Sequence, residues 1–194
     1  DVLREMEAEG VPPSRITYNV YLTAVGHSAG RGFGRLRDAD EALLWMQAAD
    51  EEMDAFTVEA YARCARLQGR SRGEGSLRWK KERDRGIFKA WDLFRLLAPK
   101  RRTHSLYAAM IDAFGSIGKE GIAVGLLDLA DNHGLTPNLA MFNAALRSCR
   151  SVEAVTDVRA KMLARRIRGN SATKKLLERA AAGADLTQNY KYFK

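Results

Sequence analysis

The sequence has few cysteines, few histidines and no long hydrophobic run. Its two cysteines, Cys64 and Cys149, lie far apart and outside any CxxC pattern, which argues against a disulfide framework or a zinc site. His27, His104 and His133 are dispersed, without partners at the spacing of a metal site or a catalytic triad. Charged residues, Gly or Pro interrupt every apolar stretch well before the roughly 20 residues that a membrane-spanning helix needs. We therefore expect no metal, cofactor, small-molecule substrate, enzymatic activity or membrane insertion.

Hydrophobic residues make up 46% of the 194 residues, which is enough for a real core. The charge is uneven: residues 1–54 hold 5 Lys/Arg against 11 Asp/Glu, whereas the remainder holds 27 against 13. A strongly basic part suggests a polyanionic partner, most often nucleic acid. An ordinary solvated surface explains the same counts, so charge alone leaves both interpretations open.

The chain contains internal repeats. Residues 10–22 align without gaps on residues 134–146, with glycine, proline, asparagine and leucine recurring identically. In each copy the glycine closes one helix, the proline prevents its continuation, and Ser14 or Asn138 can cap the next helix. The segment before Gly10 accordingly has the pattern of the second half of a helix that ends at a glycine, and we expect further sequence upstream. Equivalent positions recur at intervals of 40, 49, 35 and 32 residues: Tyr18, Val58, Tyr107, Phe142 and Lys174.

Apolar faces at helical spacing predict a second helix in each repeat, and no useful stretch alternates as a strand would. The fold class that we predict is all-α, a helical-hairpin repeat solenoid that forms a right-handed superhelix of about four to five degenerate repeats. Short helices of this kind gain most of their stability by stacking on neighbouring repeats. The predicted segments are 1–14 (a helix remnant of an upstream repeat), 15–54, 55–103, 104–138, 139–170 and 171–194 (a basic terminal helix and tail).

Three segments resemble pentatricopeptide repeats: Ile16-Thr17-Tyr18-Asn19, residues 42–46 (Ala-Leu-Leu-Trp-Met) and the Gly134-Leu135-Thr136-Pro137-Asn138 ending. The unit from 104 to 138 is the cleanest match. The Trp and Leu-Gly signature of the related tetratricopeptide repeats is absent. The resemblance implies a non-catalytic, RNA-associated protein of an organelle, in the mitochondrial matrix or alternatively in a plastid.

Two repeats contain extra residues. Residues 26–37 are rich in glycine and arginine, and we expect them to lengthen the turn between two helices as a surface loop. Residues 69–86 hold seven Lys/Arg against three acids around Trp79, and we expect a second loop there. Arginine and lysine neutralise phosphates and an indole can stack on an unpaired base, which suits RNA. A solvated linker whose Trp79 packs back on the protein is the alternative.

Residues 159–179 hold eight Lys/Arg against one acid, which is the most basic stretch of the chain by net charge. Such density favours phosphate contact over an ordinary solvated face. The aromatic and basic tail, residues 189–194, suggests a segment held by a partner. The predicted phosphate-binding residues are Arg70, Arg72, Lys80, Lys81, Arg83, Arg85, Lys100, Arg101, Arg102, Arg165, Arg166, Arg168, Lys174 and Lys175.

The resemblance also implies that each repeat reads one base through a residue early in its first helix and the last residue of the repeat. The pairs would be Asn19 with Asp54, Glu59 with Thr103, Ala108 with Asn138, and Asn143 with Asn170. In the first and last pairs the side chains can hydrogen-bond a base edge, and the family pattern implies pyrimidines. Ala108 has no polar group, and Glu59 would place a negative charge where RNA passes. Irregular repeat spacing also breaks a pitch of one base per repeat.

We therefore expect binding through basic patches rather than sequence-specific reading. The leading hypothesis is a structural subunit of an organellar, most readily mitochondrial, ribosome that contacts ribosomal RNA and neighbouring proteins. Two alternatives remain open at this point. One is a transcript-specific RNA-binding factor for RNA processing or translation. The other is a protein–protein scaffold in another organellar complex.

Overall fold

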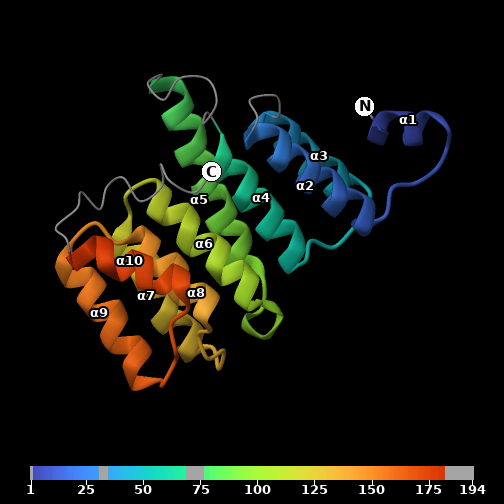
Figure 1. Cartoon of the computed structure of the whole chain (residues 1–194). Coiled ribbons are helices and arrows are strands. Elements are labelled where there is room, and N and C mark those ends of the chain that lie inside the picture. Colours follow the sequence, from blue (N-terminus) through green and yellow to red (C-terminus); the bar gives the residue numbers. More distant parts are fainter. Residues whose placement is uncertain (1, 31–34, 69–76, 182–194) are drawn as a thin grey trace. The chain divides into compact units, whose positions relative to one another are not determined.

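The computed structural model describes residues 2–30, 35–68 and 77–181, which form ten α-helices and one short 3₁₀ helix (Figure 1). No β-strand occurs in these ranges, and neighbouring helices contact one another as in a helical repeat solenoid. The predicted fold class is thus confirmed. The chain divides into two units, Asp1–Leu97 and Ala98–Lys194, and each is described by itself. The handedness of a superhelix and the boundaries of the repeats stay predictions.

The first unit places the first helices of two repeats side by side. Helix α2 packs on α4, while the second helices α3 and α5 pack on α2 and α4 and touch each other. Helix α1 joins them through Leu3, which lies in a cluster with Tyr18 and Met46. The helices of this unit are α1 (Val2–Ala8), α2 (Arg15–Gly30), α3 (Leu36–Ala48), α4 (Ala55–Leu67) and α5 (Leu77–Leu96).

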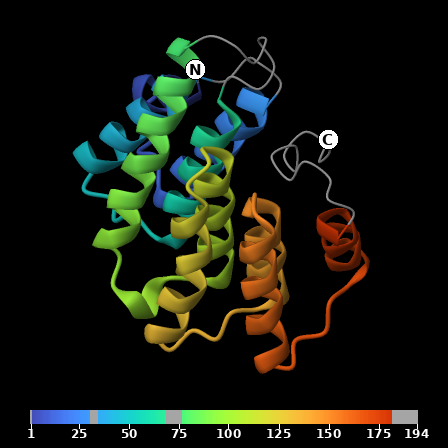
Figure 2. The same cartoon turned by 90° about the vertical axis from the view of Figure 1, so that its left-hand side faces the viewer.

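The second unit repeats this arrangement. The first helices α6, α8 and α10 pack in sequence, and the second helices α7 and α9 lie beside them and contact each other. Figure 2 shows α9 in orange and α10 in red. The elements are η1 (Pro99–Arg101), α6 (His104–Ser116), α7 (Glu120–Asn132), α8 (Leu139–Ser148), α9 (Val152–Ala164) and α10 (Ser171–Ala181).

Five of the described helices end in the same way. After α1, α6 and α7 the left-handed residue is glycine: Gly118 with φ 76°, and Gly10 with φ 71° and Gly134 with φ 75°, the last two as the repeat alignment predicts. After α3 and α9 the same conformation falls on Asp50 and Arg166, both with φ 54°. The next amide then bonds back five residues, for example from Ile167 to the Met162 carbonyl at 3.0 Å. This closure satisfies carbonyl groups that a helix end otherwise leaves without partners.

The repeat positions found by alignment are core positions. Tyr18, Tyr107 and Phe142 are all buried, as is Val58 at the equivalent place in α4. The equivalent residue of α10, Lys174, is exposed, and its neighbour Thr173 is buried instead. The Lys174 side chain remains in water because the free energy needed to bury an unpaired ammonium group far exceeds the gain from a hydrophobic contact.

Both predicted loops are largely helical where the structure describes them. Residues 26–30 continue α2, Arg35 is the extended N-cap of α3, residues 36 and 37 begin α3, and residues 77–86 form the first half of α5. The apolar face of α5 explains the extension: Ile87, Ala90 and Phe94 are fully buried and continue the helical spacing past the basic residues. Gly86 belongs to that face, since a Cβ there would lie 2.6 Å from Leu36 Cδ2. The remaining parts of the two insertions, 31–34 and 69–76, lie outside the described residues.

Candidate nucleic-acid interface

The last residue of each predicted repeat is a helix cap. The side chains of Asp54, Thr103 and Asn138 each accept a hydrogen bond from the backbone amide three residues later, at the start of α4, α6 and α8. Asn170 does the same for α10, where its Oδ1 accepts from the Thr173 amide at 3.0 Å. Asn, Asp and Thr are the residues that favour this position. The side chains expected to face a base are therefore fixed by the backbone that follows them.

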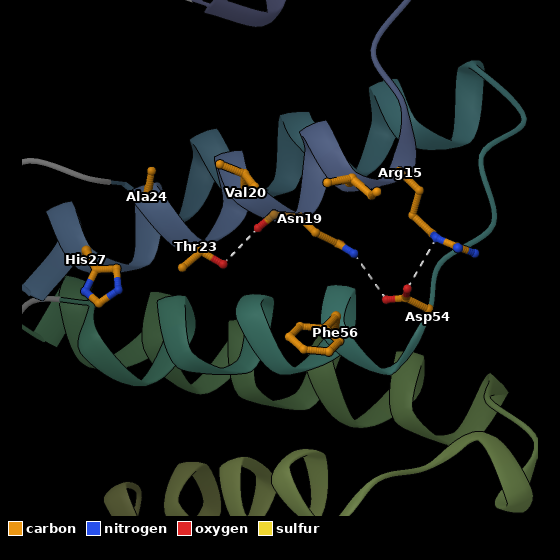
Figure 3. Close-up of a pocket in the computed structure, with 9 residues that line it drawn as sticks. Arg15, Asn19, Val20, Thr23, Ala24, His27, Asp54 and Phe56 are labelled. Carbon is orange, nitrogen blue, oxygen red and sulfur yellow. Dashed lines mark hydrogen bonds and ion pairs between the residues drawn. The ribbon is translucent and has the colours of Figure 1, made fainter.

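The first predicted pair, Asn19 and Asp54, is in direct contact. Asn19 Nδ2 donates to Asp54 Oδ1 at 3.3 Å, and the Thr57 hydroxyl donates to Asn19 Oδ1 at 2.8 Å. Arg15 Nε lies 3.3 Å from the other carboxylate oxygen, Asp54 Oδ2 (Figure 3). Four side chains from α2, the cap and α4 thus form one polar cluster.

Asp54 remains ionised at neutral pH. Burial raises the pKa of this carboxyl, but hydrogen bonds from the Thr57 amide and hydroxyl and from Asn19, together with the charge of Arg15, outweigh burial. The resulting pKa is below the ordinary value. Asp54 therefore presents a hydrogen-bond acceptor to its surroundings.

An open pocket of about 550 Å³ lies over this cluster, between α2 and α4 (Figure 3). Its polar residues are Arg15, Asn19, Thr23, His27 and Asp54, and Ile16, Val20, Ala24 and Phe56 supply the rest of the lining. Ile16, Val20 and Phe56 are 71%, 64% and 69% exposed, which is unusual for large apolar side chains grouped around one opening. The volume falls within the range of about 300–1,000 Å³ for small-molecule sites.

A smaller cavity of about 160 Å³ continues the pocket along α4 towards Glu59, Arg63 and Leu67. The negative charge expected at Glu59 is largely neutralised here, because Arg63 Nη2 lies 2.6 Å from its carboxylate. Glu59 is also buried, with 8% of its surface exposed. The predicted obstacle to RNA on this face is therefore weaker than the sequence suggests.

The last predicted pair has the same geometry in the second unit. Asn143 Nδ2 donates to Asn170 Oδ1 at 3.4 Å, and the Thr173 hydroxyl donates to Asn143 Oδ1 at 2.7 Å. The position equivalent to Arg15 is occupied by Leu139. This cluster is thus an all-amide version of the first, without a carboxylate or a guanidinium group.

The two middle pairs have no such cluster. Ala108 has no polar side chain, and Asn138 caps α8. Glu59 pairs with Arg63, and Thr103 caps α6 in the other unit. Among the four predicted pairs, only the first and the last bring two amide or carboxylate side chains together.

Several residues predicted to bind phosphate are engaged within the protein. Arg85 pairs with Asp40, Arg83 with Asp84, Arg165 with Asp131, and Lys174 with Glu178. Arg102 donates to His133 Nδ1 at 3.1 Å. Trp79 is half-buried on α5, and Arg70, Arg72 and the tail lie outside the described residues. The other predicted phosphate-binding side chains are exposed: Lys80, Lys81, Lys100, Arg101, Arg166, Arg168 and Lys175.

The described part of the chain offers little other chemistry. No group of three or more His, Cys, Asp or Glu side chains there could hold a metal ion, and no helix there is long and apolar enough to cross a membrane. The two cysteines do not form a disulfide: Cys64 is buried within α4, as predicted, whereas the buried Cys149 follows the last residue of α8 instead of lying within a first helix. Burial, with smaller contributions from nearby carboxylates, raises the pKa of both thiols to about 12.

A comparison with known protein families finds a match at the start of the chain. The pentatricopeptide repeat domain matches residues 1–28, which span α1, the Gly10 turn and most of α2. The match and the stacked helix pairs support a pentatricopeptide repeat protein. No curated protein matches the chain. Pentatricopeptide repeats suggest an RNA-associated protein, and proteins that contain them are generally non-catalytic and mostly organellar, in mitochondria or plastids.

Proposed function

We propose that this pentatricopeptide repeat protein binds single-stranded RNA without catalysing a reaction, and that the α2/α4 pocket receives an unpaired base. One observation supports this most directly. The Asn19–Asp54 pair lies at an opening surrounded by exposed Ile16, Val20 and Phe56. Apolar walls with a few fixed polar groups match the two chemical faces of a nucleobase.

Each part of the pocket has a counterpart in an unpaired nucleotide. The ring of Phe56 offers a surface for stacking, which is worth about 1–3 kcal/mol per base. The Asp54 carboxylate accepts from a base N–H, and Asn19 keeps a second amide N–H beyond the one that Asp54 receives. The exposed guanidinium of Arg15 lies beside these groups and can approach a phosphate.

The exposed cations support the electrostatic half of the proposal. Lys80 and Lys81 project from α5, Arg166 and Arg168 lie between α9 and α10, and Lys175 lies in α10. Each phosphate that they neutralise adds to the salt dependence of binding. Most of the affinity for RNA would then come from phosphate contacts, and the asparagine clusters would set the preference for particular bases.

The cellular setting that we propose is a resident subunit of an organellar ribosome, with the mitochondrial ribosome first. Few and degenerate repeats, two asparagine clusters instead of four and a basic excess in residues 55–194 fit a fixed anionic surface better than a long transcript-specific reader. The partners would be ribosomal RNA and neighbouring proteins. Co-sedimentation tests this: the protein should follow ribosomal particles at moderate salt and leave them at high salt. Migration with another organellar complex, or as free protein, would favour the scaffold or transcript-specific alternatives.

The pocket is tested by Phe56→Ala. Because Phe56 is 69% exposed, its removal should leave folding intact while reducing affinity for a fluorescently labelled oligo(U) about tenfold. Leu44→Ala is the matched control, since Leu44 is 61% exposed on α3 and does not line the pocket. Equal affinities of the two variants and the unmodified protein in anisotropy titrations would contradict base binding at this pocket.

A further inference from the structure

Two buried threonines complete the asparagine clusters. Thr57 is fully buried and Thr173 is 2% exposed, and each is the third residue of a first helix. Their hydroxyl oxygens accept from the backbone amide of the cap residue, Asp54 or Asn170, at 3.1 Å in both cases. The same hydroxyls reach the asparagine of the preceding repeat at 2.8 and 2.7 Å.

The hydrogen atoms of these groups allow only one assignment of the asparagine amide. A threonine hydroxyl has a single proton, and the shortest contact of each is to the amide oxygen of Asn19 or Asn143. The amide nitrogen must then face the cap residue, to which it donates. A reversed amide would place its oxygen against the oxygen of the cap residue, Asp54 Oδ1 in the first cluster and Asn170 Oδ1 in the second, with no proton between them.

The repeats of this chain supply an internal comparison. Threonine occupies the third helical position where the preceding repeat has asparagine, at Thr57 after Asn19 and at Thr173 after Asn143. Where the preceding repeat has Glu59 or Ala108, that position is Leu106 or Met141. Capping alone does not require threonine, because Thr103 and Asn138 cap their helices with these apolar residues in place. In these repeats the threonines therefore occur with an asparagine in the preceding repeat, and not wherever a cap residue precedes the helix.

We infer that Thr57 and Thr173 are positioning residues for RNA recognition, each holding the asparagine of the preceding repeat with its amide nitrogen towards the cap residue and the base. This inference rests on the proposed function. Neither threonine contacts RNA, since both are buried and Thr57 does not line the pocket. Each acts by fixing which hydrogen-bonding group the asparagine presents.

The first test compares Thr57→Val, Thr57→Ser and the unmodified protein in titrations of oligo(U), oligo(C) and oligo(A) of equal length. Valine keeps the shape but loses the hydroxyl, so the preference for a pyrimidine strand over oligo(A) should fall about tenfold. Serine should restore it. Thr156→Val is the matched control, because the Thr156 hydroxyl also donates to a backbone carbonyl four residues earlier, that of Val152, but lies on α9 and does not line the pocket. Retained preference in Thr57→Val would overturn the inference.

The second test separates this inference from the proposed function. In ¹⁵N NMR spectra the side-chain amide of Asn19, assigned by its loss in Asn19→Ala, should be protected from exchange in the Thr57→Ser protein and exposed in the Thr57→Val protein. An unchanged amide in Thr57→Val would refute positioning even if RNA binds. If the unmodified protein shows no preference among the strands, base reading at this pocket fails, and the inferred role in recognition fails with it.

Discussion

Removing the charge of Asp40 should destabilise the first unit in a pH-dependent way. This carboxylate of α3 accepts from the Tyr61 hydroxyl of α4 at 2.7 Å and from Arg85 and Lys89 of α5 at 2.9 and 2.7 Å. It therefore links three helices from two repeats. Burial raises the pKa of Asp40, but the hydrogen bonds from Lys89 and Tyr61 and the charges of Lys89 and Arg85 outweigh burial and hold the pKa below its usual value.

The magnitude follows from the exposure of the partners. Arg85 is 64% exposed and Lys89 is 39% exposed, so water screens both pairs and together they add about 1 kcal/mol or less. The Tyr61 hydroxyl belongs to a fully buried residue, and leaving it without an acceptor costs about 1–3 kcal/mol. Asp40→Ala should thus lower the free energy of unfolding by about 1–4 kcal/mol. Asp40→Asn, which keeps an acceptor for Tyr61, should lower it by about 1 kcal/mol.

The sign of the pH dependence is fixed by the lowered pKa. A group whose folded-state pKa lies below its unfolded value stabilises the protein above the unfolded pKa of about 3.9, and this contribution is lost as pH falls through the folded value. The cost of Asp40→Asn should therefore be largest near pH 7 and shrink below pH ~4. Asp92→Asn, at an exposed site on α5, is the control.

Tryptophan fluorescence suits this measurement, because all three tryptophans, Trp45, Trp79 and Trp91, belong to the first unit. Urea unfolding followed by fluorescence then reports on the unit that contains Asp40. A cost of Asp40→Asn that stays the same from pH 7 to pH 3 would refute the assigned role of the charge.

Two further predictions concern helix ends and thiols. Arg166→Gly should stabilise the second unit by about 1 kcal/mol, because glycine adopts the left-handed conformation without the steric cost of a Cβ. Thermal unfolding followed by circular dichroism measures the gain. The control, Arg168→Gly, should not stabilise the unit, and an equal gain in both variants would contradict the assigned strain at Arg166. Cys64 and Cys149 should resist alkylation in the folded protein at pH 8 and react after unfolding, because burial raises the pKa of both thiols to about 12. Rapid labelling of the native protein would contradict this and show that the helices around the two thiols open.

The helix ends and caps could be predicted from the sequence because they are local. A left-handed glycine, a proline that blocks continuation and a capping side chain lie within five residues, so Gly10, Pro13 and Ser14 mark one helix end and Gly134, Pro137 and Asn138 mark another. The same logic reveals the exceptions. Asp50 and Arg166 take the glycine position without being glycine, and no residue pattern marks them.

Only part of each asparagine cluster could be predicted from the sequence. The resemblance identified Asn19 with Asp54 and Asn143 with Asn170, but it gave no role to the threonines that hold the two asparagines. A signal was present: threonine recurs at the third helical position in Thr17, Thr57 and Thr173. Its meaning needs the contact between neighbouring first helices, which joins residues 38 positions apart in the first cluster.

Charge counts were the weakest guide, as the segment Arg165-Arg166-Ile167-Arg168 shows. Arg165 pairs with Asp131 and donates to the Lys161 carbonyl, so part of its charge is already used to join α9 to α7. Arg166 is exposed in a strained left-handed turn, and Arg168 is exposed beyond it. Three arginines that count equally in a sequence thus have three different environments. Because a phosphate gains most from a cation without an internal partner, Arg166 and Arg168 should account for more of the salt dependence of RNA binding than Arg165.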